Sequence, residues 1–397
     1  MKPANMNAMT KNAATKNAAT MLNIDRYFNQ LIAASTPEAP AWNMEKILSG
    51  AENKWNYIDG CMIKAVLEMY YITQKDMYLQ FADNFIDYYV LEDGSIKTFD
   101  KAEYNIDNIN EGKVLFDLYD LTHKGKYEKA IHTIYNQLES HPRTEEGNFW
   151  HKKIYENQVW LDGLYMAQPF YTAYETKFNA LKNYHDIIQQ FRIVEKQMKD
   201  ETTGLYYHGY DSKKTMFWCN PETGLSKNFW GRAMGWYVMA LIDVVESMDE
   251  QMFYEYRYMM SLFKNAIDAL IQVQSESGMW YQVLDKPDVE GNYLETSASA
   301  IIAYAILKGV RLGVLTERYK DYGLKAFWDI CDRYLVEKDG SLSLGGICLV
   351  AGLGGKEMRD GSVAYYLSEP IVENEAKGVA PFLLCYTEIV RKEYISV

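Results

Sequence analysis

The sequence has 397 residues, of which 48% are hydrophobic, so the chain can bury a large core. Its 54 acidic and 41 basic residues give a net charge of −13, which argues against nucleic acid as a partner because a polyanion requires a basic surface. No apolar run is long enough to span a bilayer, so we expect no membrane partner. The five cysteines form no CxxC pair and the six histidines form no HExxH motif, so we expect neither a disulfide framework nor a metal site.

The N-terminal residues have a composition unlike the rest of the chain. The pentapeptide Thr-Lys-Asn-Ala-Ala occurs twice in succession, at residues 10–14 and 15–19, and no apolar core of a signal peptide is present. We therefore expect residues 1–22 to be a disordered or expression-derived leader and residues 23–397 to form a single domain. We expect a cytoplasmic protein, or a periplasmic one if a signal peptide has been removed.

From Ile24 onward, apolar residues recur at helical spacing and predict about twelve helices of two alternating kinds. One kind is apolar on nearly every face and should be buried all round, whereas the other has a charged face and should lie outside. The apolar segments are Trp55–Tyr71, Ile106–Leu121, Trp160–Phe178, Phe229–Ser247, Glu295–Gly313 and Asn374–Arg391. The amphipathic segments are Ile24–Ser35, Asp76–Leu91, Tyr127–Ser140, Tyr184–Met198, Phe253–Gln274 and Arg318–Glu337.

The connections between the helices repeat as well. Five of the amphipathic segments are followed by a turn glycine and a short extended segment, which is typical of a short strand. Six alternating helix pairs predict an all-α fold, an (α/α)6 barrel of six inner and six outer helices with short strands in the rim loops. An open α-solenoid is the competing arrangement. The turn glycines are Gly94, Gly147, Gly204, Gly278 and Gly340.

Most of the apolar helices begin with polar or charged residues. In a closed barrel these starts, and the long loops before them such as 200–228 and 338–373, should meet at one rim. Helix capping alone can explain many of these residues, because Asp, Asn, Ser or Thr at a helix start stabilises it by about 1 kcal/mol. For Asp59, Asp107 and Glu373, capping is at least as good an explanation as function.

Asp162 differs from the other acids at helix starts. Trp160 and Tyr165 surround it with apolar surface, and a carboxylate in such a place must be paired, hydrogen-bonded or functional. An acid held near neutrality can donate a proton and take one back, as a hydration or hydrolysis step requires. Asp107 could supply a second carboxylate nearby. We therefore predict that Asp162 is a catalytic acid and base.

Several other residues are candidates for contact with a substrate. Arg232 lies one turn before Trp236 on the same helical face, and an arginine in an apolar helix needs an anion, either a protein carboxylate or a substrate carboxylate. His151 and His208 follow aromatic rim turns, where each is as consistent with a structural hydrogen bond as with a substrate contact. Tyr57, near the start of the first apolar helix, is a further candidate.

With these motifs the chain resembles the unsaturated rhamnogalacturonyl hydrolases, glycoside hydrolase family 105, which are (α/α)6 barrels. The resemblance extends over roughly residues 55–388 and rests on several motifs in the same order. These are Trp160-Leu-Asp-Gly-Leu-Tyr-Met-Ala, Phe229-Trp-Gly-Arg-Ala-Met-Gly-Trp, Tyr104-Asn-Ile-Asp-Asn-Ile-Asn-Glu-Gly, Ala351-Gly-Leu-Gly-Gly, and Asp360-Gly-Ser with Tyr365-Tyr-Leu-Ser-Glu-Pro.

The resemblance implies that Asp162 is the proton donor and base and that Asp107 is its partner carboxylate. It implies hydration of the C4–C5 double bond that a pectin lyase leaves on a terminal uronate, with an unsaturated uronic-acid oligosaccharide as the partner and no metal or organic cofactor. We expect a monomer or a weak homodimer. The residues implied to hold the unsaturated uronate are His151, Trp160, His208, Arg232 and Trp236.

Three alternatives stay open from the sequence. The first is an unsaturated glucuronyl hydrolase acting on glycosaminoglycan fragments, which has a similar fold and acid. The second is an ordinary inverting glycosidase, in which the carboxyl groups of Asp107 and Asp162 would be about 6.5–9.5 Å apart. The third is a non-catalytic sugar-binding scaffold, for which Asp162 would be dispensable.

Overall fold

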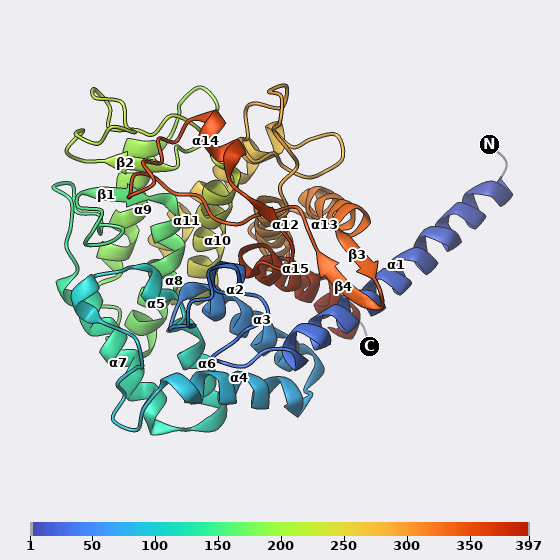
Figure 1. Cartoon of the computed structure of the whole chain (residues 1–397), viewed down its shortest axis with the longest axis horizontal. Coiled ribbons are helices and arrows are strands. Elements are labelled where there is room, and N and C mark those ends of the chain that lie inside the picture. The colour runs from blue at the N-terminus through green and yellow to red at the C-terminus, as the bar shows by residue number, and fades with distance from the viewer. Residues whose placement is uncertain (1–2, 396–397) are drawn as a thin grey trace.

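In the computed structural model, which describes residues 3–395, the apolar helices form an inner ring (Figure 1). Each inner helix packs against the next along the chain, and the last one packs against the first, so the ring is closed. This confirms the (α/α)6 barrel over the open solenoid. The inner helices are α3 (Tyr57–Thr73), α5 (Asp107–Asn110) with α6 (Lys113–Thr122), α8 (Leu161–Lys177), α10 (Gly231–Ser247), α12 (Thr296–Arg311) and α15 (Ala376–Ile395).

The amphipathic helices cover this ring from outside, each packed against its inner neighbour. Their buried faces carry the apolar residues and their outer faces carry the charges, as expected from the sequence. They are α4 (Asp76–Tyr89), α7 (Gly125–Ser140), α9 (Tyr184–Met198), α11 (Phe253–Gln272), α13 (Lys320–Tyr334) and the C-terminal part of α1 (Pro3–Ala33). The short helices are α2 (Met44–Ser49), α14 (Val363–Ser368), and the 3-10 turns η1 (Lys101–Glu103) and η2 (Glu317–Tyr319).

Helix α1 begins at Pro3, so the segment expected to be a disordered leader is helical in this structure. Its N-terminal part extends away from the barrel (Figure 1). The segment is rich in alanine, the strongest helix former, which accounts for helix where composition suggested disorder. Lys16 in this part forms an ion pair with Asp332 at 2.7 Å.

One inner helix differs from the sequence-based expectation. The segment Ile106–Leu121 was predicted as a single helix, but it is divided into α5 and α6 at Glu111 and Gly112. The backbone there tightens to 3-10 hydrogen bonds, such as Gly112 N–H to the Ile109 carbonyl at 3.0 Å. A Cβ at Gly112 would lie 2.7 Å from Ile134, so the close packing of the neighbouring helix requires glycine here.

Helix α8 contains a proline at its centre. Pro169 has no N–H, so the carbonyl of Tyr165 four residues earlier has no intrahelical partner. The side chain of Asn110 in α5 donates to this carbonyl at 3.1 Å, and Asn110 is fully buried. A neighbouring inner helix therefore satisfies the backbone group that the proline leaves open.

The strands are short and lie in the connections, as expected. Three antiparallel pairs are present among the described residues, and all five repeated turn glycines have positive φ, from 74° at Gly204 to 114° at Gly147, which favours glycine. The pairs are β1 (Gln158–Trp160) with β2 (Gly209–Asp211), β3 (Leu335–Lys338) with β4 (Ser341–Leu344), and β5 (Ile347–Cys348) with β6 (Ile371–Val372).

Within residues 3–395, no helix has both the length and the apolar character needed to cross a membrane.

Candidate active site

A strand pair places Asp162 beside His208. Strand β1 runs directly into α8, so Asp162 is the second residue of that helix, and β2 begins one residue after His208. Because Trp160 is paired with Gly209, the N–H of Leu161 donates to the carbonyl of His208 at 3.1 Å. The two side chains meet at the rim, where Nε2 of His208 lies 3.4 Å from Oδ2 of Asp162.

A second set of backbone hydrogen bonds places Asp107 beside His151. The N–H of Ile106 donates to the carbonyl of His151 at 3.1 Å, and the N–H of His151 donates to the carbonyl of Gln158 in β1 at 2.8 Å. The start of α5 is thus tied through His151 to the strand that leads into α8. Nε2 of His151 lies 3.4 Å from Oδ1 of Asp107.

Asp107, His151 and Asp162 line a cavity of about 260 Å³ at the mouth of the barrel. Its volume is slightly below the range of roughly 300–1,000 Å³ that holds small-molecule ligands, so it suits a single sugar ring. Burial and the nearby carboxylates of Glu45 and Asp107 raise the pKa of Tyr57, so its hydroxyl keeps its proton. Five of the eight candidates from the sequence are in the lining: Tyr57, Asp107, His151, Trp160 and Asp162.

Asp162 does not cap its own helix. The first turn of α8 has no side-chain cap, and Oδ2 of Asp162 is buried without a hydrogen-bond partner among the described residues. The nearby His208 is fully buried, and its Nδ1 is paired with the hydroxyl of Tyr366 at 2.7 Å. Oδ2 of Asp162 thus faces His208, while the side chain as a whole lines the cavity and is 14% exposed, so Asp162 can contact a substrate there.

Asp107 has very different partners. Nζ of Lys152 lies 2.6 Å from Oδ2 of Asp107. Burial is the largest single effect and raises the pKa of this carboxyl, but the charge of Lys152 and its hydrogen bond, together with the charges of His151 and Lys377, hold the pKa of Asp107 below its usual value. Asp107 is thus ionised at neutral pH, and the cavity holds one carboxylate that is firmly paired and one that is not.

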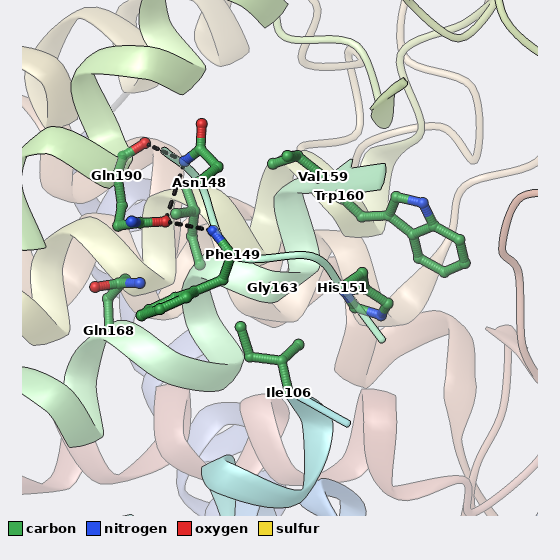
Figure 2. A pocket seen from close by; sticks show the side chains of 10 residues that line it. Ile106, Asn148, Phe149, His151, Val159, Trp160, Gly163, Gln168 and Gln190 are labelled. Atoms are coloured by element: carbon green, nitrogen blue, oxygen red, sulfur yellow. Dashed lines mark hydrogen bonds between the residues drawn. The ribbon is translucent and has the colours of Figure 1, made fainter. Parts of the chain in front are cut away.

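His151 is held neutral by its surroundings. Burial lowers the pKa of His151 to about 4, against the opposing charge of Asp107. Its Nδ1 has no partner among the described residues and lies 3.2 Å from the position that a Cβ on Gly163 would take. Behind the ring is an enclosed space of about 10 Å³, close to the minimum for one water molecule, between His151 and the side chains of Gln168 and Gln190 (Figure 2).

Aromatic rings form one wall of the cavity. Trp160 is stacked between His151, with ring centroids 4.3 Å apart, and Tyr155, at 4.8 Å. Behind Trp160, the two long rim loops meet, where Trp218 and Leu353 pack against it. The expectation that these loops gather at one rim is therefore confirmed.

The other acids at helix starts have structural partners. Asp59 is fully buried and accepts hydrogen bonds from Trp42 at 2.7 Å and Asn53 at 2.6 Å. Glu295 caps α12 by accepting from the N–H of Ala298 at 2.6 Å. These residues hold the rim together. Glu45 also lines the cavity, but it is paired with Lys377, which leaves Asp107 and Asp162 as the carboxylates proposed for chemistry.

Three candidate residues, His208, Arg232 and Trp236, lie outside the cavity lining, and His208 is linked to the cavity through its contact with Asp162. Nη1 of Arg232 donates to the carbonyl of Cys348 at 2.5 Å and to Oγ of Ser297 at 3.2 Å, so its anchors are a carbonyl and a hydroxyl where a carboxylate was expected. Trp236, expected to contact the substrate, is 1% exposed and stacks on Tyr165 at 4.8 Å within the core. Helical spacing places the two residues on one face, but the face lies against neighbouring helices.

The structure adds three cations and an aromatic ring that the sequence did not single out. Lys46, Lys152, Tyr155 and Arg359 line the cavity together with the predicted residues. The positions of two of the cations could have been noticed. Lys152 directly follows His151, and Arg359 directly precedes the Asp360-Gly-Ser motif. Both cations are therefore adjacent in sequence to residues that the sequence analysis had singled out. Within residues 3–395, no group of three or more His, Cys, Asp or Glu side chains has the arrangement to hold a metal ion.

Residues 31–393 match the family model described as Glycosyl Hydrolase Family 88. The chain belongs to this family. A solved family 105 glycoside hydrolase from C. acetobutylicum is 44% identical, and the match covers 94% of this chain and 100% of that one with a TM-score of 0.84. The resemblance predicted from the sequence motifs is thereby confirmed.

Two further relatives bear on the substrate. The unsaturated rhamnogalacturonyl hydrolase YesR of Bacillus subtilis is 29% identical over 295 residues, which cover 73% of this chain and 78% of that protein. The unsaturated glucuronyl hydrolase of Bacillus sp. GL1, which degrades glycosaminoglycan, is 15% identical, with a TM-score of 0.60 over 85% of this chain and 88% of that one. At that identity, the second likeness shows the shared fold alone.

Proposed function

We propose that this chain removes the unsaturated galacturonyl residue from the non-reducing end of rhamnogalacturonan lyase products by hydrating the C4–C5 double bond. The observation that carries this proposal is the pair of carboxylates in one cavity, with Asp107 paired to Lys152 and Oδ2 of Asp162 unpaired. The similarity to YesR over most of both chains supports the same substrate class.

In this reaction Asp162 donates its proton to C4 of the enol ether. The positive charge that develops at C5 and the ring oxygen is stabilised by the ionised Asp107 across the cavity. A water molecule adds its oxygen to C5 and returns its proton to Asp162, which restores the acid. The hemiketal formed at C5 then opens, and the rearranged sugar releases the neighbouring residue as an alcohol.

The cavity offers positive charge to an anionic sugar although the whole chain is acidic. Lys152 and Arg359 line it, while the guanidinium of Arg232 lies below the mouth, with its Nε unpartnered among the described residues. The flat rings of Trp160 and Tyr155 offer a surface on which a sugar ring can stack. The substrate class therefore matches both the charge and the shape of the lining.

Loss of ultraviolet absorbance from the double bond provides the test. We expect turnover of the unsaturated galacturonyl-rhamnose disaccharide by the wild type, and a loss of roughly 10²–10⁴-fold or more in kcat for Asp162→Asn with an unchanged circular dichroism spectrum. Asp100→Asn, which changes an exposed rim aspartate in the same way, should retain wild-type turnover. Near-normal turnover by Asp162→Asn would contradict the mechanism.

The same assay separates the alternatives. Faster turnover of an unsaturated chondroitin disaccharide than of the galacturonyl-rhamnose disaccharide would point to a glucuronyl hydrolase. Activity on the saturated galacturonyl-rhamnose disaccharide, measured by release of rhamnose, would point to direct displacement at the anomeric carbon. Binding of both without turnover would point to a sugar-binding scaffold.

A further inference from the structure

A groove of about 850 Å³ lies beside the cavity and shares two lining residues with it. Tyr155 and Arg359 line both spaces, so they form the boundary between them. The groove is bordered by the loop after His151, by the loop that follows β2, and by the turn at Gly354 and Gly355. Any part of a substrate that leaves the cavity past Tyr155 enters this groove.

The cations that line the groove outnumber the anions able to pair with a ligand. Asp211 is one of the lining acids. Oδ2 of its carboxylate accepts hydrogen bonds from the N–H groups of Thr215 at 2.7 Å and Met216 at 2.9 Å, so this oxygen is already bonded within its own loop. The remaining acids, Glu156 and Glu357, are exposed, and Glu357 lies 3.9 Å from Arg359. The lining cations are Lys153, Lys213, Lys356 and Arg359, of which Lys213 pairs with Glu145 at 3.1 Å.

Arg359 is fixed at the boundary with one end of its guanidinium exposed to both spaces. Its Nε donates to the carbonyl of Gly354 at 3.2 Å, and its Nη2 donates to the hydroxyl of Tyr155 at 3.2 Å. The side chain is 17% exposed, and Nη1 makes no hydrogen bond to another described residue. Lys356, three residues earlier, forms no ion pair within the described part of the chain.

We propose that this groove binds the second acidic sugar of a longer lyase product, an inference that rests on the proposed function. Rhamnogalacturonan alternates galacturonate with rhamnose, so a tetrasaccharide product carries its next carboxylate two residues beyond the unsaturated end. With that end in the cavity, the neutral rhamnose crosses the boundary at Tyr155, and the second uronate lies in the groove. Arg359, Lys356 and Lys153 provide its counter-charges, so the groove selects chain length and charge.

The test compares the unsaturated disaccharide with the unsaturated tetrasaccharide at low ionic strength. We expect kcat/KM of the wild type to be several-fold to about tenfold higher for the tetrasaccharide, the size expected of exposed ion pairs. Lys356→Glu should reduce this ratio, and Lys153→Glu with Lys356→Glu should bring it close to one, with turnover of the disaccharide unchanged. Lys214→Glu, an equal change of charge on an exposed residue outside the lining, should leave the ratio unchanged.

A tetrasaccharide whose internal uronate is methyl-esterified separates charge from length. It should behave like the disaccharide, and 0.5 M salt should abolish the advantage of the free acid because exposed pairs are screened. A wild type that turns over the disaccharide without preferring the acidic tetrasaccharide would overturn the proposal, as would a ratio that the double variant does not change.

A binding measurement keeps this inference separate from the reaction. The Asp162→Asn variant is titrated calorimetrically with the acidic and the esterified tetrasaccharides, alone and combined with Lys153→Glu and Lys356→Glu. Tighter binding of the acidic form that the two lysine variants abolish would support the groove. Equal binding of the two forms would overturn the groove whatever the turnover shows, and absent turnover of the disaccharide would overturn only the proposed function.

Discussion

At the scale of single residues, Asp107 and Asp162 are chemically the same group in the same cavity, and their neighbours separate their roles. Lys152 lies 2.6 Å from Asp107 and keeps it ionised, whereas Asp162 faces the neutral ring of Trp160 and the buried His208. Differences of this kind are how one site assigns an acid and a charge stabiliser to two carboxylates. The assignment therefore depends on Lys152 as much as on the aspartates.

Replacing Lys152 should change the pH dependence of turnover. In Lys152→Met, Asp107 loses the cation that lowers its pKa, so burial dominates and the pKa rises. We expect the acid limb of the kcat/KM profile for the disaccharide to move to higher pH, with activity at pH 5 reduced more than activity at pH 7. Lys153→Met, which changes an exposed neighbour, is the control and should keep the wild-type profile; an unmoved acid limb in Lys152→Met would contradict this role.

A buried histidine outside the cavity should contribute to stability in a defined pH window. Burial lowers the pKa of His141 to about 4, and its Nε2 is paired with the carbonyl of Trp150 at 2.8 Å. Since the unfolded chain takes up this proton near pH 6.5 and the folded chain does not, stability is lost as pH falls from 6.5 to about 4. Between pH 7 and 4.5 the wild type should lose about 2 kcal/mol more unfolding free energy than His141→Gln, measured by urea denaturation. Equal losses of unfolding free energy in the wild type and in His141→Gln would contradict this prediction.

Much of the site could be predicted from the sequence, and the misses have physical reasons. Motif order identified Asp107 and Asp162, which meet in one cavity through backbone pairing that no local pattern shows. Trp236 was expected in the pocket but lies in the core. Nearly all of α10 is buried, so helical periodicity could not distinguish the side toward the mouth from the side toward α8. Arg359 lies 204 residues after Tyr155 in the sequence, and only the fold brings the two side chains together.

At the scale of elements, close helix packing depends on residues with little or no side chain. A Cβ at Gly231 would lie 2.8 Å from the carbonyl oxygen of Tyr281, and one at Gly235 would lie 3.2 Å from Ile301 in α12. The sequence predicted the helices themselves well, because apolar periodicity over 15 residues is a strong signal. It missed the division between α5 and α6, where the i to i−3 hydrogen bonds leave the apolar pattern intact.

The hydrogen bond between Asn110 and Tyr165 should be needed because of Pro169. Asn110→Leu leaves the Tyr165 carbonyl buried without a partner, which should lower the free energy of unfolding by about 1–3 kcal/mol. In the double variant with Pro169→Ala, the helix supplies an N–H to the same carbonyl, so the loss should be smaller than in Asn110→Leu alone. Urea denaturation of the wild type, the two single variants and the double variant measures the coupling energy. Unfolding free-energy losses that simply add would contradict this role of Asn110.

At the scale of the whole molecule, the ring is closed by contacts between its two ends. The N–H of Ala376 in α15 donates to the carbonyl of Trp42 at 2.9 Å, and Glu375 accepts from the N–H of Met44 at 3.0 Å. Glu375 is fully buried and paired with Lys377 at 2.8 Å. Lys377 also pairs with Glu45 in α2, so this charged cluster joins the last inner helix to the segment that precedes the first one.

Loss of one member of this pair should weaken the closed ring. Glu375→Gln leaves the buried ammonium of Lys377 with Glu45 as its remaining carboxylate partner, so we expect the free energy of unfolding to fall by about 1–3 kcal/mol. Glu373→Gln is the matched control, because Glu373 pairs with the exposed Lys338 at 3.3 Å, and its loss should be within about 1 kcal/mol. Comparable losses in the two variants, measured by thermal and urea unfolding, would show that Glu375 does not secure the closure.

The joining of the two ends also dictates when an active molecule can arise during protein synthesis. The cavity draws its lining from residue 43 to residue 359, and α15, the helix that holds the first segment in place, follows all of these residues in the chain. Partial chains hold the early helices with apolar faces that have no neighbour yet, a state prone to aggregation. The first sugar can therefore be processed only after α15 has been synthesised.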